Sequence, residues 1–482
     1  MLAAFVMLPT SALVYCLGAP LAWRRRIVDL AVAGVVLIAV SFSWVLAYDL
    51  TPPDRRPYAG TTSKNSMLGL AVGPYGLGRF VRLAEFRSAS IAAAAAPTTE
   101  AAGSTDRALE AGPRRGLARL FVRAPAGALR LADGQLAGQV GWLLPVVLAG
   151  VVLGASRDRT RGPLSGTRLA VILWLGWLVT YGVVYSYAGG FFHFYYLVTI
   201  APPLAALAGI GLVVLCEAFL QSARRGTLLP VTLLLTAGWQ LYIDASALGW
   251  TLGESHPLHI ALVSGALLSA AVLIVMLAVR PGASRPLGPR ARALAASAVA
   301  IGLVAALLAP AAWALSSVLV PGAAALPSAD LGRFVPVAGE APARVRVAER
   351  YDPTGLVEFL EANYAGERYL LATTTTRLAA PIFIASGRSV MAMGGFHGLD
   401  PILTPERLAA MVEARQIRFV MVGDAGFISR RLGADVAARP ITEWVQAKGQ
   451  LVDPALWRSS VLGGRRSGMR LYDLRPAPPT AR

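Results

Sequence analysis

The sequence is poor in charge, in cysteine and in lysine. Only 15% of its 482 residues are charged and 55% are hydrophobic, and the hydrophobic residues come in long blocks, which indicates a membrane protein. Its two cysteines, Cys16 and Cys216, lie inside apolar blocks, and no disulfide or zinc pattern is present. Lys64 and Lys448 are the only lysines, so arginine supplies nearly all of the positive charge.

The sequence also lacks the start of a secretory signal peptide. Met1 opens directly into apolar sequence, and the arginines 24–26 follow the apolar block instead of preceding it. This order predicts a first span that runs from the outside to the cytoplasm. Because such a start is unusual, we expect further spans upstream of Met1.

Apolar blocks predict about eight transmembrane helices, because a helix needs about 20 apolar residues to cross the hydrocarbon core. The eight blocks are Met1–Trp23, Ile27–Tyr48, Val140–Ser156, Leu169–Tyr187, Tyr196–Cys216, Thr227–Ser246, His259–Val279 and Ala293–Leu319.

The charge of +18 is concentrated in the connections between these blocks. Four connections hold thirteen arginines, whereas the alternate short connections, Ala188–Tyr195 and Ala247–Leu258, hold no lysine or arginine. This is the positive-inside pattern, and it predicts that the arginine-rich connections are cytoplasmic. The basic charge therefore reflects topology, and a nucleic-acid partner is not expected.

This topology predicts a multi-span α-helical protein of the bacterial plasma membrane with a small soluble α/β domain at its C-terminal end. The expected parts are two spans in 1–48, an extracytoplasmic loop 49–139 with a flexible linker 88–116, six spans in 140–320, a connector 321–350 and an extracytoplasmic domain 351–474. In that domain, helical and extended patterns alternate, which favours a mainly parallel sheet. Helices are expected at Leu356–Asn363, Pro405–Ala414 and Ile441–Lys448, and strands at Arg368–Thr373, Ser389–Met393, Arg418–Gly423 and Met469–Leu474.

Two outer loops carry the candidate binding residues. The first follows the second span, and its adjacent Arg55 and Arg56 offer planar donors suited to a phosphate; a solvated loop is the alternative. The second is glycine-rich and aromatic, and its imidazole and phenol groups suit a sugar ring or a lipid phosphate; an interfacial aromatic girdle is the alternative. The candidates are Asp54, Arg55, Arg56, Tyr58, Lys64 and Asn65 in the first loop, and His193, Tyr195 and Tyr196 in the second.

Other patterns give weaker evidence for a functional site. Asp244, Glu254, His256 and His259 have the residue types of a metal site, but Pro257 interrupts the helix that would align both histidines, so a divalent metal is not expected. The glycines at 394–398 favour a turn over a phosphate loop, and no nucleophile arrangement is present.

Several segments in order resemble bacterial mannosyltransferases of the aminoarabinose-transferase-like, protein-mannosyltransferase superfamily, glycosyltransferase family 39, with a YkcA/YkcB-like C-terminal domain. The segments are Asp49-Leu-Thr-Pro-Pro-Asp-Arg-Arg-Pro-Tyr-Ala-Gly60, Lys64-Asn-Ser66, Gly76-Leu-Gly-Arg79, Gly141-Trp-Leu-Leu-Pro145, Phe192-His-Phe-Tyr-Tyr196, Ala201-Pro-Pro203, Gly394-Gly-Phe396, Asp400-Pro401 and Leu403-Thr-Pro-Glu406.

The resemblance implies a GT-C fold, an extracytoplasmic active site and a sugar donor carried on polyprenyl phosphate. It also implies that the catalytic aspartate, a general base in the family's first outer loop, lies upstream of Met1 with five further spans. This chain departs from the family pattern at Lys64-Asn65, Pro74-Tyr75-Gly76 and His193-Phe194-Tyr195-Tyr196.

The leading hypothesis is a glycosyltransferase that moves a mannose-like sugar or a pentose from polyprenyl phosphate to an extracytoplasmic glycan, lipid or protein. In it, Arg55 and Arg56 bind the lipid phosphate, and Lys64, Asn65, His193, Tyr195 and Tyr196 line the donor site. The competing hypothesis is a non-catalytic membrane protein whose soluble domain binds a glycan or a partner. A transporter is disfavoured, because neither paired intramembrane charges nor an inverted repeat is evident.

Overall fold

The computed structural model forms two compact units. The membrane unit comprises Met1–Ile38 and Gly76–Ala348, and the sheet unit comprises Ala39–Tyr75 and Glu349–Arg482. Within them the structure describes residues 5–53, 55–60, 65–72, 125–156, 164, 166–188, 192–248, 256–280, 287–319, 328–329, 353–396, 398, 400–423, 434–458 and 469–475. The expected flexible linker 88–116, Arg79 and all of the expected connector 321–350 except residues 328–329 lie outside these residues.

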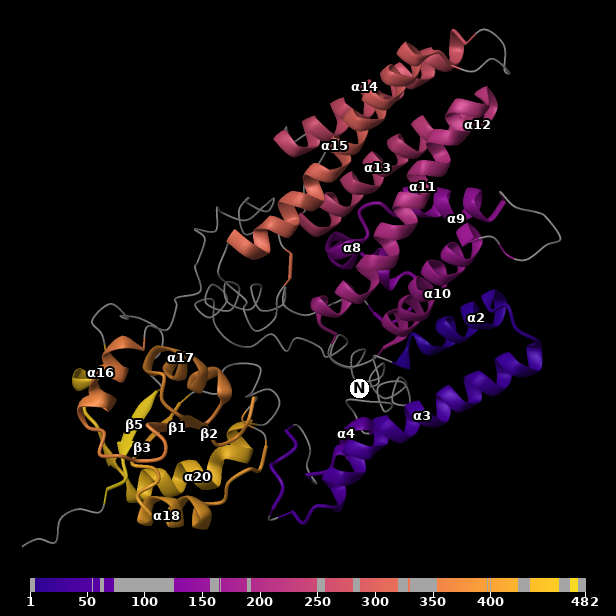
Figure 1. Ribbon diagram of the computed structural model, residues 1–482. Coiled ribbons are helices and arrows are strands. Elements are labelled where there is room, and N and C mark those ends of the chain that lie inside the picture. The colour runs from indigo at the N-terminus through magenta and orange to yellow at the C-terminus, as the bar shows by residue number, and fades with distance from the viewer. Residues whose placement is uncertain are drawn as a thin grey trace, which may run out of the picture. The chain divides into compact units, whose positions relative to one another are not determined.

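Long apolar helices dominate the first part of the chain (Figure 1). Within the described residues, six are long and apolar enough to cross a membrane, or seven if one bent pair forms a single span. The helices are α2 Leu8–Gly18, α3 Trp23–Leu50, α8 Gly134–Val140, α9 Leu144–Ser156, α10 Gly166–Tyr187, α11 Ala201–Gln221, α12 Ala223–Gly226, α13 Leu228–Leu248, α14 Pro257–Ala278 and α15 Pro289–Leu319, with the 3-10 turns η1 Arg130–Ala132 and η2 Phe194–Ile200. The predicted multi-span helical fold is confirmed.

Two of the eight expected spans take a different form. Helix α2 has only 11 residues, which at 1.5 Å per residue covers about half of the hydrocarbon thickness. It packs on α10, where a Cβ added to Gly176 would lie 2.8 Å from a side-chain carbon of Thr10. The third expected span, Val140–Ser156, corresponds mainly to α9, and a break around Gly141 joins α9 to the preceding α8 with a bend of 68°.

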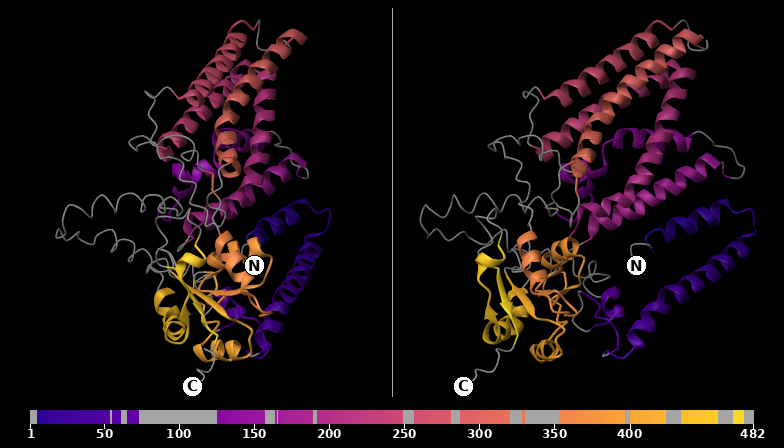
Figure 2. Two further views of the ribbon diagram at one scale, coloured as in Figure 1. Left: turned by 90° about the vertical axis from the view of Figure 1, so that its left-hand side faces the viewer. Right: turned by 60° about the vertical axis from the view of Figure 1, so that its left-hand side comes forward.

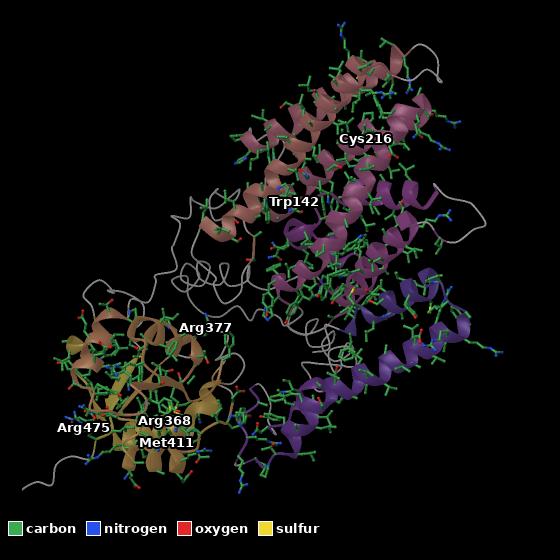
Figure 3. All side chains as sticks on the ribbon, viewed as in Figure 1. Trp142, Cys216, Arg368, Arg377, Met411 and Arg475 are labelled. Carbon is green, nitrogen blue, oxygen red and sulfur yellow. The ribbon has the colours of Figure 1, made fainter. Side chains whose placement is uncertain are left out.

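The break between α8 and α9 has its own hydrogen-bond partners. The indole nitrogen of Trp142 donates to the carbonyl of Gly138 at 3.0 Å, and that of Trp239 donates to Gly141 at 2.7 Å. The side chain of Gln240 reaches the carbonyl of Trp142 at 3.3 Å. Backbone carbonyls released by a helix break must be satisfied internally in a membrane, and here side chains supply the donors. Figure 3 labels Trp142 among the helices of the membrane unit.

Helices α9 and α11 approach each other through glycine. A Cβ added to Gly150 would lie 2.6 Å from the Cα atom of Gly211 and 2.8 Å from the carbonyl oxygen of Leu207. Small residues allow such backbone contact between spans, where dispersion and weak polar contacts replace the hydrophobic effect.

The arginines at one end of these helices also make interhelical contacts. The Arg280 guanidinium, just after α14, donates to the carbonyls of Phe219 at 3.0 Å and Leu220 at 2.7 Å near the end of α11. These two arginine-flanked helix ends therefore lie together, which agrees with the alternation of the predicted topology.

The sheet unit holds a five-stranded sheet in the order β2-β1-β3-β5-β4. Strand β1 pairs in parallel with β2 and β3, whereas β5 pairs antiparallel with β3 and β4, so the sheet is mixed where a mainly parallel one was expected. Its elements are α16 Thr354–Ala362, β1 Leu371–Thr373, α17 Thr376–Ser386, β2 Val390–Ala392, α18 Pro405–Glu413, β3 Phe419–Val422, α20 Ala434–Lys448, β4 Gln450–Leu451, η4 Pro454–Leu456 and β5 Arg470–Asp473, together with the short α4 Met67–Val72 near the end of α3.

Helices cover both faces of this sheet (Figure 1; Figure 2). Helices α16 and α17 pack on one face around Leu360 and Ile382, and α18 and α20 pack on the other around Leu408 and Val445. Strand β3, at the centre of the sheet, is apolar and buried throughout because both of its faces are covered. The expected small α/β domain is confirmed.

Candidate functional site

The loop that follows α3 is organised by Asp49. Its carboxylate accepts hydrogen bonds from the backbone nitrogens of Met67 at 2.8 Å and Leu68 at 3.0 Å, and from the Ser66 hydroxyl at 2.9 Å. Asp49 thus caps α4 across 17 to 19 residues of sequence. It closes the loop at its base.

Arg56 supports the same base. Its Nη1 donates to the carbonyls of Tyr48 at 3.1 Å and Asp49 at 2.9 Å, and its guanidinium lies 5.2 Å from the centre of the Tyr48 ring. Its side chain is only 9% exposed, whereas that of Arg55 is exposed. The two adjacent arginines therefore occupy different environments, and their predicted joint binding of a phosphate stays a prediction.

Asn65 is the third support of this loop. Its side-chain oxygen accepts hydrogen bonds from the Tyr48 hydroxyl at 2.8 Å and from the backbone nitrogen of Ala59 at 2.7 Å, and its own φ is 49°. Asn65 therefore holds the loop against the end of α3. Tyr58 is half-buried, and Asp54 and Lys64 lie outside the described residues.

In the membrane unit, the aromatic candidates come together. The His193 and Tyr195 rings stack at 5.2 Å with an angle of 8° between their planes. The Tyr196 ring meets them edge-on, 5.4 Å from His193 and 4.8 Å from Tyr195. Tyr195 is 40% exposed, so this aromatic cluster, His193–Tyr196, offers an accessible ring face.

A buried arginine that the sequence analysis did not single out lies behind this cluster. Arg130 is 7% exposed, and its Nη1 donates to the carbonyls of Tyr185 at 3.1 Å and Ala188 at 2.7 Å. Its guanidinium lies 4.7 Å from the centre of the Phe192 ring, which in turn lies 5.6 Å from Tyr196. No motif surrounds Arg130, and it lies ten residues before the apolar block Val140–Ser156, so no local signal in the sequence singles it out.

Arg130 has an unusual electrostatic environment. Its Nε is buried without a hydrogen-bond partner, and none of the ion pairs among the described residues includes it. Burial lowers the pKa of its guanidinium, because desolvation disfavours the charged form. A buried cation with a spare donor is costly alone and favours an anion beside it.

The remaining patterns can also be placed. Asp244 and His259 are in contact, Glu254 is outside the described residues, and no group of three metal-ligating side chains occurs among those described. Residues 393–396 form a turn in which Gly395 has a φ of 69°.

These features define a multi-span membrane protein with a C-terminal α/β domain and an aromatic, cationic cluster at the ends of its helices. Residues 356–448 match the family described as "Putative mannosyltransferase YkcB-like, C-terminal". The chain is 29% identical to "Putative mannosyltransferase YkcB" of Bacillus subtilis (strain 168), over 95% of this chain and 69% of that protein.

A second relative agrees. "Putative mannosyltransferase YycA" of the same organism is 29% identical over 88% of this chain and 66% of that protein. The resemblance to bacterial mannosyltransferases expected from the sequence is confirmed, and the chain spans about two thirds of each relative's length (69% and 66%). No solved structure matches the chain.

Proposed function

We propose that this protein acts as a membrane glycosyltransferase that moves a sugar from a polyprenyl-phosphate donor to an acceptor on the extracytoplasmic side. The observation that carries the proposal is Arg130, a buried cation with an unused donor beside the aromatic cluster His193–Tyr196. The relatives' printed names support a sugar-transfer reaction, and mannose or a pentose is the sugar class that we expect.

The two parts of the site suit the two parts of such a donor. A phosphate beside Arg130 would supply a counter-charge that no ion pair among the described residues provides. The apolar face of a sugar ring suits the stacked rings of His193 and Tyr195. When the sugar leaves, negative charge grows on the phosphate, and a fixed guanidinium stabilises that charge more strongly in a site that excludes water.

The side of the membrane follows from the helix ends. Arg130 contacts the carbonyls at the end of α10, close to the aromatic cluster, which lies just before the beginning of α11. Arg280 contacts the opposite end of α11. Arg130 and Arg280 therefore mark opposite ends of the helices. With arginine-rich connections in the cytoplasm, we propose that the aromatic cluster faces the extracytoplasmic side, and that the acceptor and the C-terminal domain are on that side too.

Arg130→Ala tests the proposal. Membranes from cells that express the complete open reading frame are supplied with polyprenyl-phosphate mannose carrying a radiolabelled sugar, and label transferred to the cell envelope is counted. Loss of a hydrogen-bonded charge is worth about 1.5–3 kcal/mol, so transfer and the affinity for polyprenyl phosphate should each fall about 10- to 150-fold. Arg292→Ala, an exposed arginine at the opposite helix ends, is the matched control.

Two results would count against the proposal. Unchanged affinity in Arg130→Ala would remove Arg130 from the donor site. Absence of transfer by the unaltered protein, together with retention of a glycan by its sheet unit, would favour the competing hypothesis of a non-catalytic binding protein.

A further inference from the structure

A buried carboxylate joins three spans of the membrane unit. Asp244 on α13 is 0% exposed; its Oδ2 lies 3.2 Å from Nε2 of His259 on α14, and its Oδ1 accepts the indole N–H of Trp313 on α15 at 3.1 Å. We call Asp244, His259 and Trp313 the Asp244 cluster. One turn earlier on α13, Gln240 donates to the carbonyl of Ala306 at 2.8 Å.

Stability alone gives a weak reason for such a cluster. Taking a carboxylate out of water costs several kcal/mol, and apolar side chains of similar volume often pack at least as well. The Asp244 cluster instead sets the orientation of the Trp313 ring. The contact with His259 holds the Asp244 carboxylate, and the hydrogen bond from the indole N–H fixes where the ring lies. That ring makes the next contact.

Trp313 packs directly on α8. A Cβ added to Gly138 would lie 2.9 Å and 3.0 Å from two carbons of the Trp313 ring, and the Trp142 ring meets Trp313 edge-on at 5.4 Å. Helix α13 supports the preceding turn, since the Tyr242 hydroxyl donates to the carbonyl of Ala132 at 3.2 Å. Helix α8 and the turn before it therefore rest on α15 and α13, two of the three helices that the Asp244 cluster ties together.

Helix α8 begins at Gly134, four residues after Arg130. Asp133 caps it by accepting from the backbone nitrogen of Gln135 at 3.1 Å, and the backbone nitrogen of Asp133 donates to the carbonyl of Arg130 at 3.2 Å. These hydrogen bonds fix the position of Arg130 relative to the start of α8. A shift of α8 on Trp313 must therefore be transmitted to Arg130.

We propose that Asp244 is a positioning residue for Arg130: through Trp313 and α8, it sets where the buried guanidinium meets the donor's phosphate. The inference rests on the proposed function, because it takes Arg130 as the phosphate ligand. Asp244 itself lies in the helix core and touches neither phosphate nor sugar.

The test is a double-mutant cycle read by binding. The full-length protein is purified in detergent, and its affinity for polyprenyl phosphate is measured for Asp244→Leu, Arg130→Ala and the double variant. Asp244→Leu removes both hydrogen bonds without leaving a charge, so affinity should fall about 10-fold, and it should fall no further when Arg130 is already alanine. Asp244→Asn keeps an oxygen for the Trp313 N–H and should bind like the unaltered protein.

Each other outcome has a defined meaning. Unchanged affinity in Asp244→Leu, or the same loss with and without Arg130, would overturn the positioning role. Unchanged affinity in Arg130→Ala would instead refute the proposed function. Should Asp244→Leu fail to give a monodisperse protein, Trp313→Phe removes the indole donor while keeping a ring near Gly138, and the same loss of affinity is expected.

Discussion

The contact between α9 and α11 allows a quantitative test of the helix packing. An alanine at position 211 would place its Cβ against the carbonyl oxygen of Val146 and 3.0 Å from the Cα atom of Gly150. Ordinary contacts between carbon atoms are about 3.5–4.0 Å, so the two helices must separate by about 0.5–1 Å. Such a gap forfeits a quarter to a half of the dispersion attraction of the atoms involved, and overpacking of this kind costs about 1–3 kcal/mol.

Gly209 provides a matched control on the same helix. A Cβ added there meets nothing within 4 Å, so Gly209→Ala differs from Gly211→Ala only in the clash. The gain in helix propensity is common to both variants and cancels. The difference in free energy of unfolding between them should therefore be about 2 kcal/mol, with Gly211→Ala the less stable.

The measurement is unfolding of the purified protein in mixed micelles, with sodium dodecyl sulfate as the denaturant and circular dichroism and tryptophan fluorescence as probes. The two variants are compared at equal protein and lipid content. Coincident unfolding curves would show that α9 and α11 do not touch through Gly150 and Gly211, and the packing described here would then be wrong.

Two further predictions concern the sheet unit. Arg418 is buried and binds both carboxylate oxygens of Asp473, so Arg418→Met should leave a partly buried carboxylate and lower the free energy of unfolding by about 3 kcal/mol, measured as faster hydrogen exchange in β3 and β5. The control is Arg377→Ala on the exposed side of α17 (Figure 3), which should change nothing measurable. Equal exchange in both variants would contradict the buried ion pair. Gly387 ends α17 with a φ of 66° and open space around it, so Gly387→Ala should cost about 1 kcal/mol through backbone strain alone; an unchanged melting temperature of the sheet unit would refute this.

The sequence predicts the long spans well because a single requirement governs them. A chain in hydrocarbon must bury its backbone polar groups in helices, so α3, α10, α11, α13, α14 and α15 coincide with apolar blocks. The broken pair α8 and α9 cannot be recognised this way. Its break depends on donors from Trp239 and Gln240, which come from another helix.

In the sheet unit, local patterns predict most elements but not their pairing. Helices α16 and α18 and strands β1, β2, β3 and β5 fall where alternation predicts them. Helix α17 is missed because it follows a run of threonines and contains Pro381, both of which argue against a helix locally. The antiparallel direction of β5 is set by tertiary packing, which no local pattern encodes.

In the candidate site, too, residues close in sequence could be predicted, whereas contacts between distant segments could not. His193, Tyr195 and Tyr196 are neighbours in sequence, and the structure gathers them as expected. Arg130 reaches this place through bonds to residues 55 and 58 positions away, so sequence proximity could not reveal it. Conversely, Arg55 and Arg56 are adjacent, yet only Arg56 turns inward to the end of α3.

The break at Gly141 also constrains the order in which the protein can assemble. The carbonyls of Gly141 and Trp142 receive their donors from residues 98 positions later. At synthesis rates of 5–20 residues per second, that interval is on the order of 5–20 s. During that time the segment from α8 to α9 enters the membrane without its final partners. A straight span or a water-lined position at the insertion machinery would satisfy those carbonyls meanwhile, so we expect the bend to form at a late step of biogenesis, after α13 arrives.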